Sequence, residues 1–401
     1  MVRCHEASIN VWRNVVRKDQ FSTPLPLSAS VDPRRKVCIS APQFDGNESK
    51  YVQECIDSTW VSSIGRFIAL FEEGFARFCD VPYAVAANNG TSALHLALLG
   101  CGIQPGDEVI IPTLTFVATA NAVAYCGAKP VFVDSEPRTM NLDPALIEAK
   151  ITPKTRAIIV VHLYGHPAEM DPILAIARRH NLFVVEDAAE AHGARYRGQV
   201  VGGLGDVGTF SFFGNKIITT GEGGMVTVHD AAKAALIRTY RGQGMQRDRR
   251  YWFPVIGYNY RMTNIQAALG LAQLEQIERY MAHHRTVASW YAHYLSPISD
   301  LVALPIEEPW CRHAYWLYTV ILNDAVPVDR DGLMADLAAV GIETRPVFYP
   351  MHVLPPYFEA DAHYPVADRL SARGVSLPTH IGLTEEDVAY VASHVTRLCA
   401  V

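Results

Sequence analysis

The chain has 401 residues, of which 49% are hydrophobic and 19% are charged, so it can bury a large core and is expected to form two domains. Its formal net charge of -6 argues against the basic surface that nucleic acid requires. The 15 His and eight Cys residues lack CxxC or HExxH spacing, so we expect no metal site. No apolar run reaches the roughly 20 residues that span a bilayer, so we expect no membrane association.

Residues 1–36 differ from the rest of the chain because they show little periodicity and end in a cluster of Pro and Ser. They are expected to be an extension that the fold does not need. A disordered arm, a short amphipathic helix around Ile9–Val16 and a stretch upstream of the true start all fit this sequence. The stretch lacks the apolar core of a secretion signal, so a cytoplasmic location is expected.

An anion site is predicted at residues 86–102, AANNGTSALHLALLGCG, where small and hydroxyl residues precede an apolar helix. Backbone amides near Gly90, with the hydroxyls of Thr91 and Ser92, would lie at the start of that helix and suit a phosphate. An ordinary helix cap by Thr or Ser would give the same pattern.

From Asp107 onward, strand patterns alternate with helix patterns, which predicts a parallel sheet with right-handed crossovers. The expected strands are 107–112, 129–134, 156–163 and 182–187, and the expected helices between them are 143–149 and 167–180. Two further strands, VGTFSFF and GGMVTVHD, flank a glycine-rich loop, and one long helix is expected over 265–295. We therefore expect a large α/β domain over 37–275 and a smaller α+β domain over 276–401.

Two residues in this pattern suit the chemistry of an aldehyde cofactor. Lys216 lies in FSFFGNKIITTGEGG, between a strand and a glycine-rich turn, where partial dehydration would make its amine a nucleophile. Asp187 ends the apolar strand LFVVED, at the sheet edge where open α/β sheets bind ligands. Together they offer pyridoxal phosphate an amine for its aldehyde and an anion for its ring nitrogen. Asp187 could instead cap a helix that begins in DAAEAHGA.

The chain resembles the DegT/DnrJ/EryC1/StrS family of pyridoxal phosphate enzymes that act on nucleotide sugars. The motifs that carry this resemblance follow in order: NNGTSALHLAL, DEVIIPTLTFVATANAVAYCGAKPVFVD, EDAAEAHGA, FSFFGNKIITTGEGGM and GYNYRMTNIQAALG. They cover most of the chain from about residue 37 onward. The resemblance implies a type I aminotransferase fold with a mostly parallel seven-stranded sheet and a homodimer with shared active sites.

The resemblance also implies roles for cofactor-binding residues. Lys216 would hold the cofactor and move the proton of the amino donor, and Asp187 would pair with the ring nitrogen. Phe116 would lie on the face of the ring, although a core Phe fits the sequence as well. Glu190 matches a position, often Gln, near the cofactor hydroxyl; as Glu it must be protonated or hydrogen-bonded there. Ser211 would join the phosphate site.

Four more residues match family positions around the phosphates and the sugar. Asn259 would reach the cofactor phosphate of the neighbouring subunit, although a turn residue fits its surroundings too. Arg261, Arg345 and His352 lie where the family gathers sugar and diphosphate contacts, and Arg suits phosphate because its planar fork bonds bidentately. Surface salt bridges for the arginines and a packed role for the histidine remain the alternatives.

The implied reaction is transfer of an amino group from glutamate to a nucleotide-linked keto sugar. The sequences of residues 40–72 and of the motifs around Asp187 and Lys216 are most similar to those of family members that convert GDP-4-keto-6-deoxymannose to GDP-perosamine. GDP-perosamine is a surface-polysaccharide (O-antigen) precursor. The alternatives are another 3- or 4-keto sugar linked to dTDP or UDP, a sugar dehydratase, or a non-catalytic cofactor-binding regulator. The related dehydratase carries His in place of Lys216, and a nicotinamide oxidoreductase would need a GxGxxG fingerprint that NNGTSALHL lacks.

Overall fold

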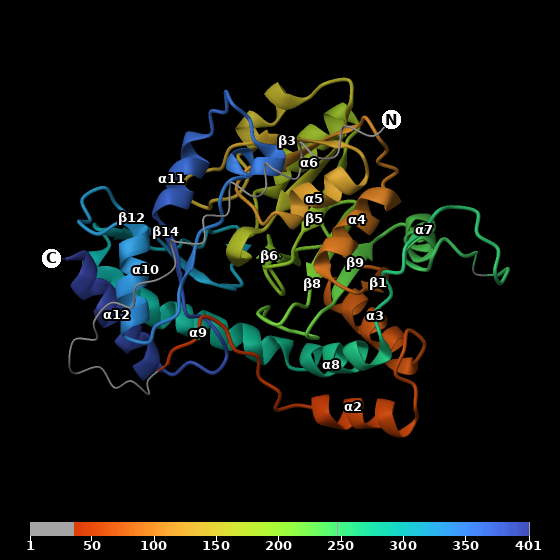
Figure 1. Ribbon diagram of the computed structural model, residues 1–401, viewed down its shortest axis with the longest axis horizontal. Coiled ribbons are helices and arrows are strands. Elements are labelled where there is room, and N and C mark those ends of the chain that lie inside the picture. The colour runs from red at the N-terminus through yellow and green to blue at the C-terminus, as the bar shows by residue number, and fades with distance from the viewer. Residues whose placement is uncertain (1–35, 247, 401) are drawn as a thin grey trace, which may run out of the picture.

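The computed structural model describes residues 36–246 and 248–400, so the expected N-terminal extension lies outside the described residues apart from Lys36. The described chain is an α/β protein with a seven-stranded central sheet in the order β1-β9-β8-β5-β4-β2-β3 (Figure 1). Strands β2, β3, β4, β5 and β8 pair in parallel, and β9 runs antiparallel to both β1 and β8. The predicted fold class, a mostly parallel seven-stranded sheet, is confirmed.

The seven strands of the central sheet are short and largely buried. They are β1 (Tyr83–Ala87), β2 (Glu108–Pro112), β3 (Lys129–Val133), β4 (Thr155–Val161), β5 (Phe183–Asp187), β8 (Val207–Ser211) and β9 (Gly224–Val228). Strands buried on both faces read as continuous apolar runs, which is why 156–163 and 182–187 were recognisable in the sequence. A separate small sheet consists of β6 (Arg195–Tyr196), β7 (Gln199–Val200) and β11 (Cys311–Arg312).

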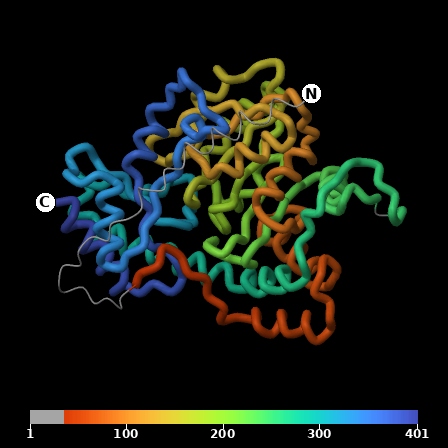
Figure 2. Tube along the Cα trace, viewed as in Figure 1, coloured from red at the N-terminus to blue at the C-terminus, as the bar shows by residue number. Residues whose placement is uncertain are grey.

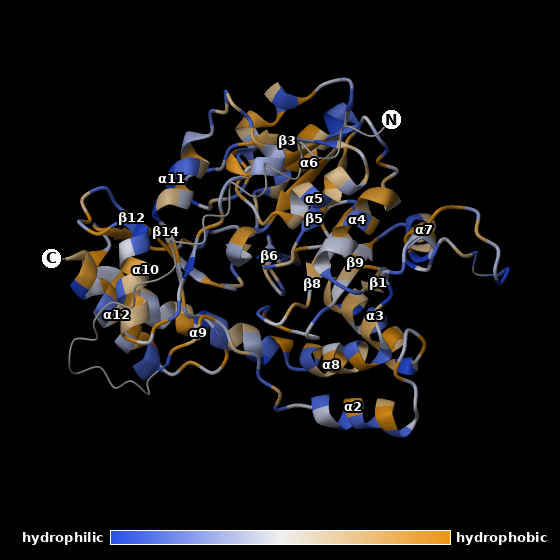
Figure 3. Cartoon of the chain, in the orientation of Figure 1, coloured by the Kyte–Doolittle hydropathy of each residue, from blue (hydrophilic) through white to orange (hydrophobic). Residues whose placement is uncertain are grey.

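Helices cover the central sheet and continue into the C-terminal part. They are α2 (Glu48–Asp57), α3 (Arg66–Phe78), α4 (Gly90–Gly100), α5 (Ala118–Tyr125), α6 (Met170–His180), α7 (Ala231–Arg241), α8 (Asn264–Leu274), α9 (Ile277–Leu295), α10 (Arg330–Ala339), α11 (Pro365–Arg373) and α12 (Glu385–Cys399). Helix α4 is buried along most of its length, whereas α2 buries two residues and mixes hydrophilic and hydrophobic colours in Figure 3. Helix α4 therefore belongs to the core beside β8 and β9.

A second core lies in the C-terminal part, around the antiparallel sheet β10-β12-β14-β13. Its strands are β10 (Val302–Ala303), β12 (Tyr318–Leu322), β13 (Arg345–Pro346) and β14 (Gly374–Leu377). Helices α9, α10 and α12 contribute apolar side chains to this core, and Val37 joins it from the start of the described chain. Figure 2 shows this part, in blue, beside the central sheet. The boundary at 275/276 stays a prediction.

Two expected helices differ in the structure. The stretch 143–149 forms only two 3-10 turns, Pro144–Leu146 and Glu148–Lys150, and the chain is extended again at Ile151. The stretch 265–295 is two helices, α8 and α9, and not one, since the chain leaves helical geometry at Gln276.

The sheet topology determines where functional side chains meet. Strands β2, β4, β5 and β8 point the same way, so their carboxyl ends form one edge. Asp187 ends β5, Ser211 ends β8, and Thr113 follows β2 at this edge. Helix α4 begins at the same edge because it follows β1, which pairs antiparallel with β9 and therefore runs in the same direction as β8.

Within residues 36–246 and 248–400, none of the helices combines the length and the apolar character needed to cross a bilayer. The same residues contain no cluster of three or more His, Cys, Asp or Glu side chains that could hold a metal ion.

Candidate active site

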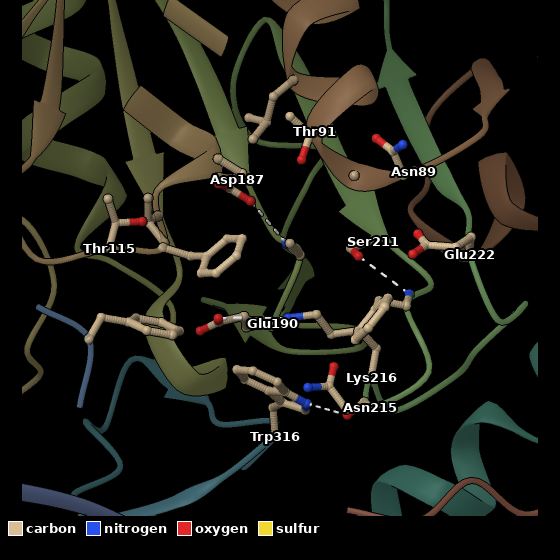
Figure 4. A pocket seen from close by; sticks show the side chains of 18 residues that line it. Asn89, Thr91, Thr115, Asp187, Glu190, Ser211, Asn215, Lys216, Glu222 and Trp316 are labelled. Carbon is tan, nitrogen blue, oxygen red and sulfur yellow. Dashed lines mark hydrogen bonds and ion pairs between the residues drawn. The ribbon is translucent and has the colours of Figure 1, made fainter. Parts of the chain in front are cut away.

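A cavity of about 420 Å³ lies at the carboxyl edge of the central sheet (Figure 4). Seven residues that the sequence predicts for the site line it together: Gly90, Thr91, Phe116, Asp187, Glu190, Ser211 and Lys216. They come from the start of α4, the loop after β2, the end of β5 and the segment after it, and the end of β8 and the β8–β9 connection. The fold thus gathers motifs that are far apart in the sequence.

Lys216 points its amine into this cavity, and its side chain is only 11% exposed. Its Nζ lies 3.7 Å from Glu190 Oε1. Burial lowers the pKa of Lys216, while the charges of Glu190 and Asp187 act against this shift. A buried lysine with a lowered pKa is partly available as a neutral nucleophile, as the sequence predicts.

Asp187 is buried at the end of β5, and its carboxylate faces the cavity. Thr119 Oγ1 donates a hydrogen bond of 2.8 Å to Oδ2, and the Ala189 amide donates one of 3.3 Å to Oδ1. Burial raises the pKa of Asp187, and a cation beside it would oppose this shift and favour the ionised carboxylate. No helix begins after Asp187 in this part of the chain, so the helix-cap alternative is wrong.

The start of α4 provides the predicted anion site. Gly90 lies against β8 so closely that an added Cβ would come within 2.7 Å of Ser211 Cβ, so only glycine fits there. Asn89, and not Thr91 or Ser92, caps the helix, because its Oδ1 accepts a hydrogen bond of 2.8 Å from the Ser92 amide. The amides of Gly90 and Thr91 in this first turn have no acceptor within the helix. Gly90 and Thr91 both line the cavity, and the Thr91 side chain points toward it (Figure 4).

Glu190 departs from the residue usual in the family, and the structure shows how its carboxyl group is held. Its Oε2 accepts a hydrogen bond of 2.8 Å from the Tyr164 amide. Burial raises the pKa of Glu190 to about 7, with the Lys216 charge opposing the shift. The group is therefore neutral below about pH 7 and charged above it. This matches the expectation that Glu190 is hydrogen-bonded or protonated.

A pH dependence follows from Glu190. Because a carboxylate repels an anionic ring oxygen, the affinity for pyridoxal phosphate is expected to fall as pH rises through about 7. Glu190→Gln removes the charge and should flatten this dependence, whereas Glu222→Gln, at the rim of the same cavity, should keep it. Equilibrium dialysis between about pH 6 and about pH 8 measures the effect. An identical pH profile in wild type and Glu190→Gln would contradict the role given to Glu190.

Aromatic side chains that the sequence did not predict form one wall of the cavity. Trp316 lines it, and so does Phe348, which contacts the predicted Phe116 with ring centroids 5.7 Å apart. Tyr164 stacks between Trp316 and Phe348 at 6.2 and 5.4 Å. Phe116 is 54% exposed, so it is a cavity residue and not a core phenylalanine. The repeated aromatics in HAYWLY and PVFYP were the available signal for Trp316 and Phe348.

Three predicted residues do not reach the cavity. Ser92 is buried, and its hydroxyl bonds Asn88 Oδ1 at 2.5 Å. His352 is buried, with Nδ1 2.7 Å from Thr113 Oγ1 and Nε2 3.1 Å from Asp368 Oδ1. This agrees with the alternative prediction of a packed histidine. Arg345 lies on β13, where it pairs with Glu343 at 2.5 Å. None of these three side chains therefore lines the cavity of its own chain, and the sugar and diphosphate contacts expected of Arg345 and His352 stay predictions.

Asn259 and Arg261 also lie away from the cavity of their own chain. Asn259 is exposed and forms a β-bridge with Gly242, at the base of the projecting segment that follows α7 (Figure 1). The Nε of Arg261 is buried and has no hydrogen-bond partner among the described residues. Neither residue contributes to the cavity of a single copy.

The cavity residues fit pyridoxal phosphate. A buried amine at Lys216, a buried carboxylate at Asp187 and free amides at the start of α4 are the three features that bind its aldehyde, ring nitrogen and phosphate. Their fit rests on the close approach of Gly90 to Ser211 as well as on the donor set. The site is thus that of a pyridoxal phosphate-dependent aminotransferase.

Comparison with known proteins agrees with this class. Residues 42–396 match the DegT/DnrJ/EryC1/StrS aminotransferase family, and the chain belongs to that family. It is 57% identical to the GDP-perosamine synthase of Caulobacter vibrioides, covering 88% of this chain and 95% of that one. It is 49% identical to the GDP-perosamine synthase of Escherichia coli O157:H7, covering 89% and 96%. A crystal structure of DesV from S. venezuelae with a ketimine intermediate has a TM-score of 0.82 at 36% identity, covering 88% and 94%.

Proposed function

We propose that this aminotransferase transfers the amino group of glutamate to C4 of GDP-4-keto-6-deoxymannose and so forms GDP-perosamine. The observation that carries the chemistry is the buried Lys216 amine, which faces Asp187 across the cavity. Identities of 57% and 49% to two GDP-perosamine synthases, over nearly the whole of each chain, support this choice of nucleotide and sugar.

Each cavity residue has its own role in the proposed reaction. Bound pyridoxal phosphate supplies an electron sink, and the Asp187 carboxylate keeps that sink effective by balancing positive charge at the ring nitrogen. The Lys216 amine holds the cofactor at rest and, when free, takes the proton from Cα of glutamate. Phe116 covers the cavity with an exposed aromatic face, and Thr91 and Ser211 hold phosphate.

The choice of nucleotide is tested with a panel of GDP-, dTDP- and UDP-linked 4-keto-6-deoxy sugars, with glutamate as donor. We expect kcat/KM for the GDP sugar to exceed that for the others by roughly a hundred-fold, because mismatched polar groups in a base site remain unpaired. Equal or higher kcat/KM with a dTDP- or UDP-linked sugar would contradict the nucleotide assignment and leave the aminotransferase chemistry intact.

A homodimer with shared sites is part of the proposal. Among the described residues that line the cavity, Lys216 is the sole cation, beside the carboxylates of Asp187, Glu190 and Glu222. A nucleoside diphosphate needs more positive charge than this. Arg261, with its unpartnered Nε, and the exposed Asn259 could supply polar contacts to the cavity of a second copy. The exposed apolar side chains of Trp60, Ile64 and Ile256 offer surface for such pairing.

Mixing two inactive variants tests the shared site. If Asn259 acts on the neighbouring subunit, Lys216→Ala and Asn259→Asp chains that exchange subunits should regain about a quarter of wild-type activity. Half of the dimers are then mixed, and each mixed dimer has one intact site. Absence of activity in a mixture that native mass spectrometry shows to contain heterodimers would place Asn259 in its own chain's site or outside any site.

A cytoplasmic location belongs to the same proposal. None of the seven described cysteines forms a disulfide, as expected for a protein in a reducing compartment. Cell fractionation of the native host tests the location.

A further inference from the structure

The amine of Lys216 contacts an aromatic face as well as the cavity. Its Nζ lies 3.6 Å from the centroid of the Trp316 ring. Among aromatic side chains, the Trp ring attracts a cation most strongly, and the attraction grows when both groups are shielded from water. Trp316 is 5% exposed and the Lys216 side chain 11%, so the contact is shielded. It favours the charged form of the amine.

Trp316 is fixed relative to the backbone that carries Lys216. Its indole Nε1 donates a hydrogen bond of 2.7 Å to the carbonyl of Asn215, the residue before Lys216. Its own amide donates to the Tyr164 carbonyl at 3.1 Å, and its ring stacks on Tyr164 with an interplanar angle of 17°. Tyr164 is held in a left-handed backbone conformation, with φ of 53°, where a non-glycine residue is strained. These contacts hold the indole under the amine.

Carboxyl groups approach the same amine from the segment after β5. Glu190 Oε1 lies 3.7 Å from Nζ, and Asp187 also acts on its charge. His192, on the same segment, is buried, and burial lowers its pKa to about 3, so it is neutral. Glu222 lines the cavity from the β8–β9 connection. The ammonium of Lys216 is therefore held between Glu190 and the face of Trp316.

We propose that Trp316 is a positioning residue whose indole face receives the Lys216 ammonium whenever that amine is not bonded to the cofactor. The amine then stays inside the cavity as a proton carrier. Trp316 contributes its π face to this role, in addition to filling space. Loss of the ring is expected to release the amine toward its neutral form, since burial alone already lowers its pKa.

The test measures the amine directly and does not depend on turnover. Full-length protein is prepared with the amine form of its cofactor, which leaves Lys216 free, and again without cofactor. Acetic anhydride labels the neutral amine, and mass spectrometry of the peptide containing residues 210–224 follows labelling against pH. The midpoint reports the pKa of Lys216, whereas the plateau at high pH reports access. Trp316→Leu should lower the midpoint by about one pH unit in both preparations. At pH values below the midpoint, the extent of labelling should therefore rise roughly ten-fold.

Trp316→Phe keeps a weaker aromatic face and removes the indole N–H, so its midpoint should fall between those of wild type and Trp316→Leu. Phe348→Leu removes another ring of the same wall, one that stacks on Tyr164, and it leaves the Trp316 ring under Lys216 Nζ, so its midpoint should equal that of wild type. If Trp316→Leu does not fold, the Trp316→Phe midpoint decides. A Trp316→Leu or Trp316→Phe midpoint equal to that of wild type, or an equal shift in Phe348→Leu, would overturn the proposal.

Discussion

Replacing Lys216 with alanine is expected to lower kcat by roughly a thousand-fold or more, because the chain loses both its attachment to the cofactor and its proton carrier. Thr91 and Ser211, which line the cavity and are proposed to hold the phosphate, are unchanged, so the variant should still bind pyridoxal phosphate. Borohydride should fix the cofactor on the peptide containing residues 210–224 in wild type and not in the variant. Steady-state kinetics and peptide mass spectrometry measure both effects.

Lys154→Ala is the matched control, because Lys154 is exposed and lies far from the cavity residues. It should keep wild-type kcat and borohydride labelling at residues 210–224. Turnover at the parent rate by Lys216→Ala would refute the assignment of Lys216.

Asp187→Asn should produce the second large loss. The substitution keeps the shape of the side chain and removes the negative charge beside the cavity, so the electron sink becomes less effective. The expected loss of transition-state stabilisation is about 2–4 kcal/mol in kcat/KM. Asp171→Asn, which changes an exposed carboxylate on α6 that pairs with Arg197, should stay within about two-fold of wild type. A drop of less than about ten-fold for Asp187→Asn would remove Asp187 from the chemistry.

The sequence was informative where function depends on short motifs. Asp187 and Ser211 each end a buried apolar strand, and Lys216 lies between a strand and glycines, so local pattern was enough to predict their place at one sheet edge. The anion site at Gly90 and Thr91 is likewise local to the start of α4. The predicted strands agree with β2, β3, β4 and β5 within about two residues.

Residues that depend on tertiary contacts were harder to predict. Trp316 meets Lys216 across 100 residues of sequence, so no local pattern places it against the amine. A histidine that binds a substrate and a histidine that hydrogen-bonds to neighbouring side chains look the same in the sequence. For His352, only the folded structure shows its contacts with Thr113 and Asp368. The break between α8 and α9 occurs without Gly or Pro, so the apolar periodicity continues through it.

Transfer of isotope from the donor tests whether this protein moves the amino group of glutamate to C4 of the GDP-linked sugar. The protein is incubated with pyridoxal phosphate, ¹⁵N-glutamate and GDP-4-keto-6-deoxymannose, and the product is analysed by mass spectrometry and NMR. We expect GDP-perosamine with ¹⁵N bonded to C4, in amounts equal to the 2-oxoglutarate formed. A product that has lost a hydroxyl group and gained no nitrogen, or ¹⁵N at another carbon, would contradict this expectation.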